Sequence, residues 1–288
     1  MHFVKAKGIL TTGNGMNLYR GCQHGCIYCD ARSACYQFTH LFEDIEVKAN
    51  APELLEAALR AKRRPCMIGG GSMTDPYMPL EREQKLTRRC LEIIEKHGFG
   101  ATLLTKSDLI LRDLDIFRRI NEKTKAVVQI TLTTLDPHIS RLIEPNVCPS
   151  ARRVEVLREF QRVGVPTVVW FCPVLPFITD TQENIRSVLA CCRDTGVKGI
   201  IWYGAGVTLR EGDREYFYAN LDRKFPGLKE KYIRTYGNAY ECLSPSHVSL
   251  EKLFHETCED YGIWHHNDQV FAYLHELEDR EPQLSLFD

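Results

Sequence analysis

Three cysteines near the start of the chain have the spacing that a metal cluster needs. Cys22, Cys26 and Cys29 stand in a CxxxCxxC arrangement, with Tyr28 directly before the last of them. A [4Fe–4S] cluster normally takes four thiolates. Three thiolates at this spacing can hold three irons and leave the fourth open, where it can chelate a cofactor and pass it an electron. The triplet therefore predicts a [4Fe–4S] cluster with one open iron.

Two other interpretations of the triplet stay open at this point. A zinc site would need a fourth ligand, which His24 or Cys35 could supply. The usual zinc pattern pairs two CxxC-like knuckles, however, and no second knuckle follows downstream. Three buried structural thiols are disfavoured, because Gly21 and Gly25 are typical of a loop rather than of a packed element.

The chain that must position these cysteines alternates short apolar runs with helical patterns up to about residue 203. This alternation predicts βαβ units and a parallel sheet, and the near-continuous apolar strands indicate that both faces are covered. Asp136 and Pro137 are interpreted as a turn signal. We expect strands at 17–19, 66–70, 101–106, 126–133, 167–172 and 199–203, and helices at 52–64, 81–97, 111–121, 150–163 and 181–195.

These units fit a curved, incomplete (β/α)6 barrel in an α/β fold. A full eight-unit barrel is the alternative, but the alternation fades after Tyr203. The later residues are more polar and helical, with helices expected at 250–261 and 268–277. We therefore divide the sequence into a barrel with the cysteine loop at 1–203, a mostly helical extension packed on the barrel at 204–281, and a flexible tail at 282–288.

The loop after the second barrel strand is rich in small and polar residues. Active sites on parallel sheets form at the carboxyl ends of the strands, where the loops converge. Gly70 and Gly71 lie at the start of this loop, and Ser72 and Thr74 follow them. Glycines allow a backbone to approach a ligand closely. A tight turn would also explain glycines, but this run is longer than a turn requires.

Three further strands end in residues with suitable chemistry. Lys106 ends the third strand and could meet a carboxylate, although a lysine at a strand end is usually just solvated. Thr131 in the fourth strand presents a hydroxyl that suits a ribose, and Cys172 ends the fifth. A thiol near a carbon radical can donate a hydrogen atom, while most buried cysteines are simply small apolar residues.

Together these stretches resemble the radical S-adenosylmethionine (SAM) superfamily, and within it the spore photoproduct lyase branch. The resemblance covers roughly residues 17 to 203. It rests on the segments Gly21–Cys29, Thr74–Tyr77 with Pro79 and Glu81, Thr131–Asp136 with Glu144–Pro145, and Gly164–Pro166 with Pro173, Pro176 and Asp180.

The resemblance implies a radical SAM partial barrel with a cluster held by Cys22, Cys26 and Cys29. The open iron would bind the amino and carboxylate groups of SAM, and one electron would cleave the sulfonium to a 5′-deoxyadenosyl radical. That electron would come from an external donor such as a flavodoxin or ferredoxin. In this branch the radical abstracts hydrogen from a cross-linked thymine pair in DNA. The implied SAM contacts are Tyr28, Gly70, Gly71, Ser72, Thr74, Lys106, Thr131 and Glu144.

Two departures from the lyase branch bear on the reaction. The lyases carry a hydrogen-donating cysteine in the loop after the second strand, close to where Ser72 stands here. Serine cannot do this work, because its O–H bond is too strong to yield a hydrogen atom to a carbon radical. Asp30, directly after the cluster motif, replaces an aromatic residue. The resemblance therefore implies the fold and the radical initiation more strongly than the repair reaction itself.

The end of the chain carries a second, separate motif. Gln283, Leu284, Ser285, Leu286 and Phe287 resemble the short peptide by which bacterial polymerases and repair proteins dock on the replication sliding clamp. Leu286 and Phe287 would enter an apolar pocket while Gln283 forms hydrogen bonds. An ordinary tail that packs its apolar residues on the barrel is the alternative.

A histidine pair near the end of the extension is a weaker candidate for chemistry. His265 and His266 follow Trp264 and could line a pocket. The sequence shows no third ligand that would make them a metal site, and aromatic residues so placed are more often packing.

The composition of the chain limits its class and location. Hydrophobic residues make up 44% of its 288 residues, and no apolar run reaches the length of a membrane span. The first five residues lack the apolar stretch of a signal peptide. Twelve cysteines then predict metal chemistry in the reducing cytoplasm rather than disulfides. A net charge of −1 gives no support for a broad basic DNA-binding surface.

The leading hypothesis from the sequence is a radical SAM enzyme that acts on a DNA lesion. One rival keeps the radical initiation but modifies RNA, a peptide or a small metabolite, and the absence of the loop cysteine favours it. A non-catalytic iron–sulfur adaptor bound to the sliding clamp is the other rival. The glycine loop and Lys106 argue against an adaptor, which has no need to bind SAM.

Overall fold

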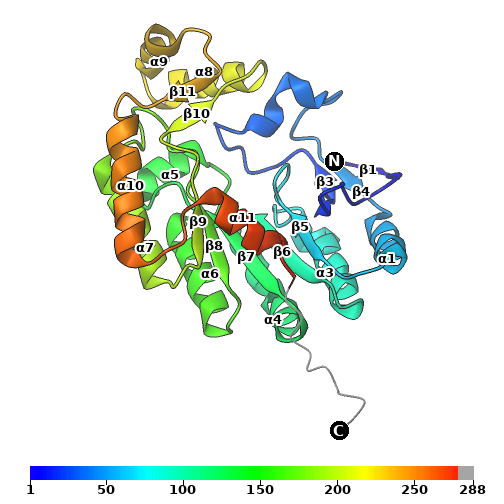
Figure 1. Cartoon of the computed structure of the whole chain (residues 1–288). Coiled ribbons are helices and arrows are strands. Elements are labelled where there is room, and N and C mark those ends of the chain that lie inside the picture. Colours follow the sequence, from blue (N-terminus) through cyan, green and yellow to red (C-terminus); the bar gives the residue numbers. More distant parts are fainter. Residues whose placement is uncertain (278–288) are drawn as a thin grey trace.

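The centre of this computed structural model, which describes residues 1–277, is a curved parallel sheet (Figure 1). Its six strands follow the order of the chain, and every neighbouring pair is parallel. The prediction of an α/β fold with a parallel sheet is thus confirmed. The strands are β2 (Gly15–Met16), β5 (Met67–Gly70), β6 (Gly100–Thr105), β7 (Ala126–Thr131), β8 (Thr167–Trp170) and β9 (Gly199–Ile201).

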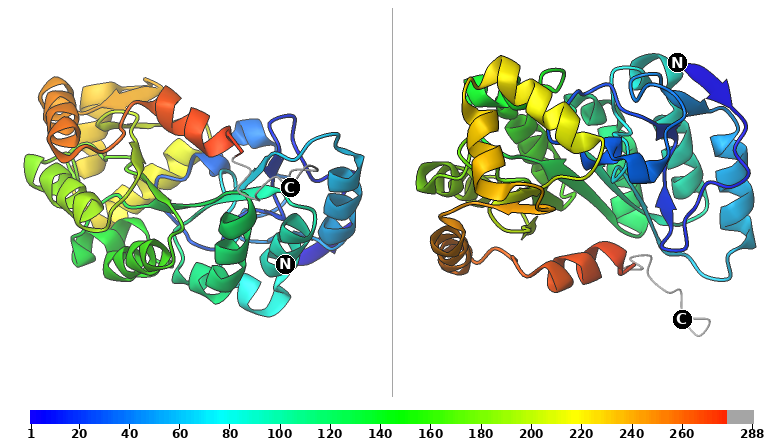
Figure 2. Two further views of the ribbon diagram at one scale, coloured as in Figure 1. Left: turned by 60° about the horizontal axis from the view of Figure 1, so that its bottom comes forward. Right: turned by 90° about the horizontal axis from the view of Figure 1, so that it is seen from above.

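The helices that connect these strands lie along the outside of the sheet, as two further views show (Figure 2). Each strand pair is joined through a helix, which is the right-handed βαβ arrangement that parallel strands require. Their apolar faces meet the sheet, and buried residues such as Leu91, Phe117 and Leu157 form one continuous core. The helices are α1 (Ala51–Ala61), α3 (Leu86–Lys96), α4 (Leu114–Lys123), α6 (Ser150–Arg162) and α7 (Gln182–Asp194).

The single helix expected at 81–97 is in fact two helices. A short helix α2 (Glu81–Gln84) ends at Lys85, whose φ of 51° lies in the left-handed region, and α3 begins directly after it. The buried Glu81 carboxylate causes the break, because it accepts the backbone N–H groups of Leu86 (3.0 Å) and Thr87 (3.1 Å) and so caps the second helix.

Asp136 and Pro137 form a helix start rather than the expected turn. The Asp136 carboxylate accepts the N–H groups of His138 (2.7 Å) and Ile139 (2.9 Å) at the beginning of α5 (Pro137–Ile143). Asp at the cap with Pro at the first helical position is a standard N-terminal signature. The structure also contains the short 3-10 helices η1 (Asp30–Arg32), η2 (Ala34–Tyr36) and η3 (Asp108–Asp113).

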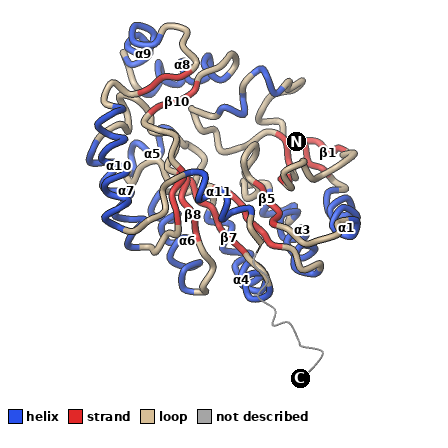
Figure 3. Tube along the Cα trace, in the orientation of Figure 1, coloured by secondary structure: helices blue, strands red, loops and turns tan. Residues whose placement is uncertain are grey.

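The strand expected at 17–19 is replaced by two shorter strands, β2 and β3 (Tyr19–Arg20), which belong to different sheets. Strand β2 ends at Met16 in the main sheet, and the chain then enters a small second sheet that flanks α1. There Lys48 N–H donates to the Leu18 carbonyl at 3.1 Å. That sheet contains β1 (His2–Val4), β3 and β4 (Glu46–Lys48). Figure 3 shows β1 of the second sheet beside β5 of the main sheet, with strands in red.

Between β9 and residue 277 the chain forms a two-stranded antiparallel sheet and four helices. Helix α10 contacts α7, and α11 contacts β9, whose Ile200 N–H donates to the Trp264 carbonyl at 2.8 Å. The division at residue 203 stays a prediction, and the clamp-like motif at 283–287 lies outside the described residues. The elements are β10 (Gly206–Thr208), α8 (Asp213–Lys224), α9 (Leu228–Tyr236), β11 (Glu241–Leu243), α10 (His247–Tyr261) and α11 (Asn267–His275).

A second apolar core fixes the cysteine loop against this segment. Cys26, Ile27 and Tyr28 are buried together with Phe217 of α8 and Tyr232 of α9. The helices after residue 204 therefore help to position the motif that the sequence analysis singled out. None of the helices within residues 1–277 is both long and apolar enough to cross a bilayer.

Candidate active site

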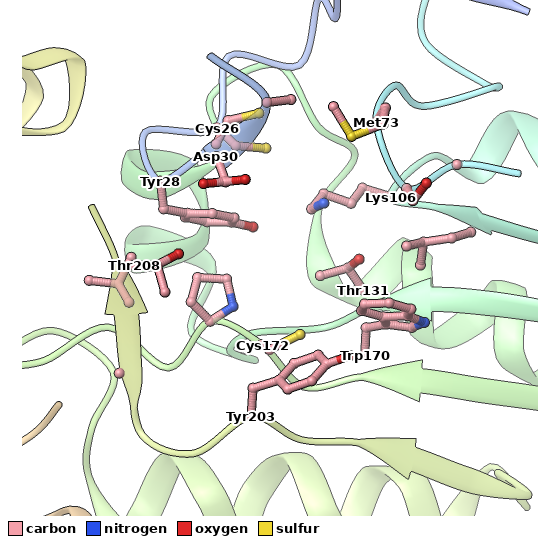
Figure 4. A pocket seen from close by; sticks show the side chains of 18 of the residues that line it. Cys26, Tyr28, Asp30, Met73, Lys106, Thr131, Trp170, Cys172, Tyr203 and Thr208 are labelled. Carbon is pink, nitrogen blue, oxygen red and sulfur yellow. The ribbon is translucent and has the colours of Figure 1, made fainter. Parts of the chain in front are cut away.

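A cavity of about 830 Å³ opens at the carboxyl ends of the parallel strands. Its walls are formed by the cysteine loop, the loop after β5, the ends of β6 to β9 and the two-stranded sheet of β10 and β11. In the close-up, Cys26 and Met73 lie at one end, and Cys172 and Tyr203 at the other (Figure 4). The cavity therefore has a cysteine-lined end and an aromatic end.

The cysteine loop is held in one conformation by its glycines and by the chain near residue 145. Gly21 has a φ of +90°, and a Cβ there would lie 2.3 Å from the Phe42 carbonyl oxygen, so only glycine fits. The side chain of Asn146 donates to the Gln23 carbonyl at 2.9 Å, and its backbone N–H donates to the His24 carbonyl at 3.1 Å. These contacts hold all three cysteines at the cavity wall.

The three thiols suit a metal cluster. Cys26 is buried, Cys22 and Cys29 are partly buried, and all twelve cysteines of the chain are free of disulfides. Burial raises the pKa of Cys22 and Cys26 to about 12 and that of Cys29 to about 11. Such thiols stay protonated at neutral pH unless a cation binds them, which is the coupling expected of metal ligands.

The spacing of the sulfur atoms favours several irons over one zinc. Within residues 1–277, two groups of potential ligands have donor atoms that all lie within 4.8 Å of one another, and the cysteine triplet is not one of them. A single tetrahedral zinc ion would bring its sulfurs to about 3.8 Å from each other. Neither suggested fourth zinc ligand joins the triplet: His24 Nε2 lies 2.8 Å from Asp75, and Cys35 is exposed beside Arg210.

Asp75 connects the three loops that meet at this end of the cavity. Its carboxylate accepts the Thr105 hydroxyl (2.6 Å) and the N–H groups of Lys106 (2.8 Å) and Tyr77 (2.8 Å), and it pairs with His24. Burial alone would raise the pKa of Asp75, but His24, Thr105 and Lys106 outweigh burial and lower it to about 2. Asp75 belongs to the motif Thr74–Tyr77, but the sequence does not reveal its role, because its partners His24 and Thr105 are distant in the chain.

Lys106 is a positively charged residue of the cavity wall without an ion-pair partner among the described residues. Its ammonium group lines the cavity about 6.0 Å from the centre of the Tyr28 ring, and within residues 1–277 it makes no hydrogen bond or ion pair. Burial lowers the pKa of Lys106, but the electrostatic effect of the nearby acidic groups Cys26, Glu144 and Asp75 more than offsets burial, so the pKa lies above its usual value. A protonated lysine aimed into a cavity can bind an anionic ligand group.

Five other predicted cofactor contacts line the same cavity: Tyr28, Gly71, Ser72, Thr74 and Thr131. Gly71 has a φ of +102°, and a Cβ there would lie 2.0 Å from the Leu104 carbonyl oxygen. The Thr74 hydroxyl already donates to the Gly21 carbonyl at 2.5 Å, so it also holds the cysteine loop.

Glu144 and Gly70, by contrast, are not among the residues that line the cavity. Glu144 lies behind the wall, where it accepts the Tyr28 hydroxyl and forms a buried ion pair with Arg153 at 2.5 Å. Arg153 also donates to the Thr131 carbonyl at 2.9 Å. Gly70 lies within the sheet, where a Cβ would meet neighbouring strands at 2.9 Å. Both residues support the wall from behind in this structure.

The aromatic end of the cavity contains Cys172. Trp170 and Tyr203 have ring centres 6.2 Å apart, and Tyr203 is 58% exposed. The Trp170 indole N–H donates to Gln129 at 2.7 Å, which fixes that ring. Burial raises the pKa of Cys172 to about 12, against the opposing charge of Lys106, so its thiol stays protonated at neutral pH.

Asp30, which departs from the lyase pattern, joins the cluster motif to the later part of the chain. Its carboxylate lies 3.3 Å from the Arg210 guanidinium and accepts the Tyr36 hydroxyl at 2.9 Å. Asp30 therefore ties the cysteine motif to the part of the chain after β9 by its polar contact with Arg210.

Comparison with known proteins places this barrel and its cysteine motif in a family. A model of the radical SAM superfamily matches residues 16–189, and the chain belongs to that superfamily. The superfamily uses a [4Fe–4S] cluster and SAM, so the predictions of an enzyme with these two cofactors are confirmed.

Two relatives of the chain are uncharacterised proteins. One, from Methanocaldococcus jannaschii, is 31% identical over 172 residues, which are 59% of this chain and 63% of the relative. Another, from Mycobacterium tuberculosis, is 28% identical over 232 residues, which are 77% of this chain and 66% of the relative. The chain thus spans slightly less than two thirds of the length of either relative. A "Radical SAM Nalpha-GlyT isomerase" of a Pseudomonas phage is 25% identical over 167 residues, 57% of this chain and 33% of that protein.

Solved structures with a similar fold include spore photoproduct lyase. A cysteine-to-serine variant of that lyase matches with a TM-score of 0.64 at 14% identity, covering 91% of this chain and 79% of the lyase. A variant with bound AdoMet and dinucleoside spore photoproduct matches with a TM-score of 0.62, covering 86% and 74%. The predicted partial radical SAM barrel is therefore confirmed.

Proposed function

We propose that this radical SAM enzyme acts on a damaged or modified base in DNA and that Cys172 returns the hydrogen atom. The observation that carries the proposal is the aromatic end of the cavity, where Trp170 and Tyr203 flank a protonated thiol. Stacking on such side chains contributes about 1–3 kcal/mol per base and needs no broad basic surface. A net charge of −1 is compatible with that mode of binding.

The cysteine-lined end is the proposed cofactor site. Cys22, Cys26 and Cys29 would hold the cluster, and when bound, cluster and SAM together supply a carbon-centred radical. Lys106 would bind the SAM carboxylate, because its ammonium group is protonated and otherwise unpaired in the cavity. The remaining proposed SAM contacts are Tyr28, Gly71, Ser72, Thr74 and Thr131.

The proposed role of Cys172 follows from the state of its thiol. A substrate carbon radical takes the hydrogen atom of the S–H bond, which leaves a new C–H bond and a thiyl radical. One electron from the external donor and one proton then restore the thiol. The raised pKa of Cys172 matters because a thiolate has no hydrogen atom to give.

One comparison supports a nucleic-acid substrate. The fold is shared with a lyase whose solved structure holds a dinucleoside spore photoproduct. Ser72 lies in the cavity where the lyases carry their donor cysteine. That observation favours the second candidate, in which the same initiation chemistry modifies RNA, a peptide or a small metabolite.

The test measures 5′-deoxyadenosine made by anaerobically reconstituted protein with SAM and dithionite. We expect product to rise with UV-irradiated DNA but not with undamaged DNA. Equal, slow formation in both cases would contradict the DNA proposal and direct the search to the second candidate. In Cys172→Ser, SAM cleavage should persist while repaired product is lost, whereas Cys191→Ser, outside the cavity, should behave as the native protein.

We further propose a cytoplasmic location, an electron donor of the flavodoxin or ferredoxin type, and docking on the sliding clamp through Gln283, Leu284, Leu286 and Phe287. Twelve free cysteines support a reducing compartment. Deletion of residues 283–287 should abolish clamp binding and leave SAM cleavage intact. Clamp affinity that survives the deletion would disprove the docking proposal.

A further inference from the structure

Three histidines gather where α10 is followed by the segment that leads to α11. His255 lies on α10, and His265 and His266 lie in that segment; one donor nitrogen from each lies within 4.8 Å of the others. The ring centres of His265 and His266 are 4.4 Å apart, and those of His255 and His265 are 5.1 Å apart. The sequence revealed the adjacent pair but no third ligand, because His255 joins it only through the fold.

The hydrogen bonding of His265 leaves one nitrogen without a partner. Its Nδ1 lies 2.9 Å from the Ile263 carbonyl oxygen, which can only accept, so Nδ1 carries the hydrogen. The lone pair then resides on Nε2. This atom is buried and has no hydrogen-bond partner in the described part of the chain, on a residue only 8% exposed. A buried polar atom without a partner calls for an explanation such as an ion.

His255 is oriented in a comparable way. Its Nε2 lies 3.3 Å from the Glu251 carboxylate, one turn earlier on the same helix. A carboxylate accepts, so Nε2 carries the hydrogen and Nδ1 is left as the donor to a metal. Histidines that bind metals usually give their other ring N–H to a carboxylate or a backbone carbonyl. His255 gives its N–H to a carboxylate, and His265 gives its N–H to a backbone carbonyl.

We propose that His255, His265 and His266 bind one divalent transition-metal ion, zinc, in addition to the iron–sulfur cluster. Three neutral imidazoles suit zinc, and tetrahedral zinc at about 2.0–2.1 Å from each nitrogen places those nitrogens about 3.4 Å apart. The nitrogens already lie within 4.8 Å of one another, so each pair would have to close by at most about 1.4 Å to reach this value. His266 is exposed, so the fourth ligand position faces solvent.

The other compact group of potential ligands lacks this feature. His2, His40 and Glu46 also lie within the same distance of one another. Both nitrogens of His40 are already engaged, with Leu41 at 2.9 Å and Glu46 at 2.8 Å, and His2 pairs with Asp44. No buried donor atom there lacks a partner, so this group needs no ion.

The proposed zinc site supports the wall of the substrate cavity. Glu251, which orients His255, also accepts the Trp202 indole N–H at 3.0 Å, and both residues line the cavity. On the other side, the Trp264 carbonyl accepts the N–H of Ile200 at the edge of the sheet. A metal held by these histidines would therefore tie α10 to the segment that covers β9. This inference does not depend on the identity of the substrate.

The test uses the full chain with its iron–sulfur cluster reconstituted, so that the cluster cysteines are occupied. After incubation with zinc chloride and desalting, we expect about one zinc per chain by mass spectrometry. His266→Ala and His255→Ala should each lose it. His266 is exposed and His255 half-buried, so the result does not depend on a variant of the buried His265. His275→Ala removes an exposed histidine of α11 outside the group and should bind zinc as the native protein does.

Two further readouts separate this site from adventitious binding. X-ray absorption at the zinc edge should show nitrogen neighbours at about 2.0–2.1 Å, whereas zinc on cysteines would show sulfur at about 2.3 Å. Saturating zinc should raise the Tm of the native protein by roughly 5 °C and leave that of His266→Ala unchanged. Equal zinc content in the native protein and both histidine variants, or a sulfur shell, would overturn the proposal.

Discussion

Replacing Arg153 by methionine should destabilise the protein strongly, although the residue lies behind the cavity and not in it. Its side chain is 0% exposed and donates to Glu144 (2.5 Å), to the Thr131 carbonyl (2.9 Å) and to Ser140 (3.1 Å). Methionine keeps an unbranched apolar side chain but removes the guanidinium group and its charge. The Glu144 carboxylate is then left buried without its cation, a change that typically lowers the free energy of unfolding by about 3–5 kcal/mol.

Urea unfolding of the cluster-free protein, followed by circular dichroism, gives the magnitude. The double variant Arg153→Met with Glu144→Gln should recover at least about 1 kcal/mol, because it no longer buries an unpaired charge. Arg162→Met is the matched control, since its pair with Glu159 lies on the surface and contributes less than about 1 kcal/mol. If Arg153→Met lowers the free energy of unfolding by less than about 1 kcal/mol, then Arg153 and Glu144 do not form a buried ion pair that supports Tyr28.

The same pair predicts a dependence on pH. Burial raises the pKa of Glu144, but Arg153 and Lys106 outweigh it and hold the pKa below its ordinary value of 4.5. A carboxyl with a lowered pKa contributes stability above that ordinary value and loses it as pH falls. The difference in the free energy of unfolding between the native protein and Arg153→Met should therefore become smaller below about pH 4.5. If this difference in free energy stays constant down to pH 3, the pKa of Glu144 does not differ between the folded and unfolded protein, which contradicts the prediction.

Three further outcomes follow from the cavity. Gly71→Ala should lower the free energy of unfolding by more than about 3 kcal/mol, because its Cβ would lie 2.0 Å from a carbonyl oxygen of β6. The control Gly98→Ala, at a φ of +68° with open space around the Cβ, should lower the free energy of unfolding by only about 1–2 kcal/mol. Lys106→Met should weaken SAM binding to the reconstituted enzyme roughly 10- to 150-fold in calorimetry, and unchanged affinity would remove Lys106 from the SAM site. The pKa of Cys172 is about 12 instead of 9.0, so at pH 8 its thiol should react with iodoacetamide about a thousandfold more slowly than an unperturbed thiol. Peptide mass spectrometry measures the rate. Fast alkylation would mean that Cys172 is a thiolate, which cannot donate a hydrogen atom.

Features that depend on neighbouring residues were predictable from the sequence. The cysteine spacing and the alternation of strands and helices both repeat over short distances, and they led to the correct fold class and cofactors. The break at Lys85 was missed because its cause is the Glu81 carboxylate turning back onto the next helix. Asp136 shows a different error: the cap signal was present in the sequence, but it was interpreted as a turn.

Features that depend on distant residues could not be predicted in the same way. Glu144 was expected to contact SAM, but its partners Tyr28 and Arg153 place it behind the cavity wall. Asp75 had no predicted role, although it joins three loops. For both Glu144 and Asp75, the sequence shows an acidic residue in a motif, but only the folded structure shows which side chains that residue contacts.

The position of the later helices bears on where the specificity of this enzyme resides. The family match ends at residue 189, within α7, and all the proposed cluster and SAM residues precede that point. Residues after that point, including Tyr203, Thr208 and Leu243, complete the wall of the cavity. The cysteine motif also contacts this later part of the chain, because Asp30 pairs with Arg210. We therefore expect substitutions of Tyr203 or Thr208 in the cavity wall to change which substrate reacts while leaving SAM cleavage intact. Substitutions of the cluster cysteines should abolish both.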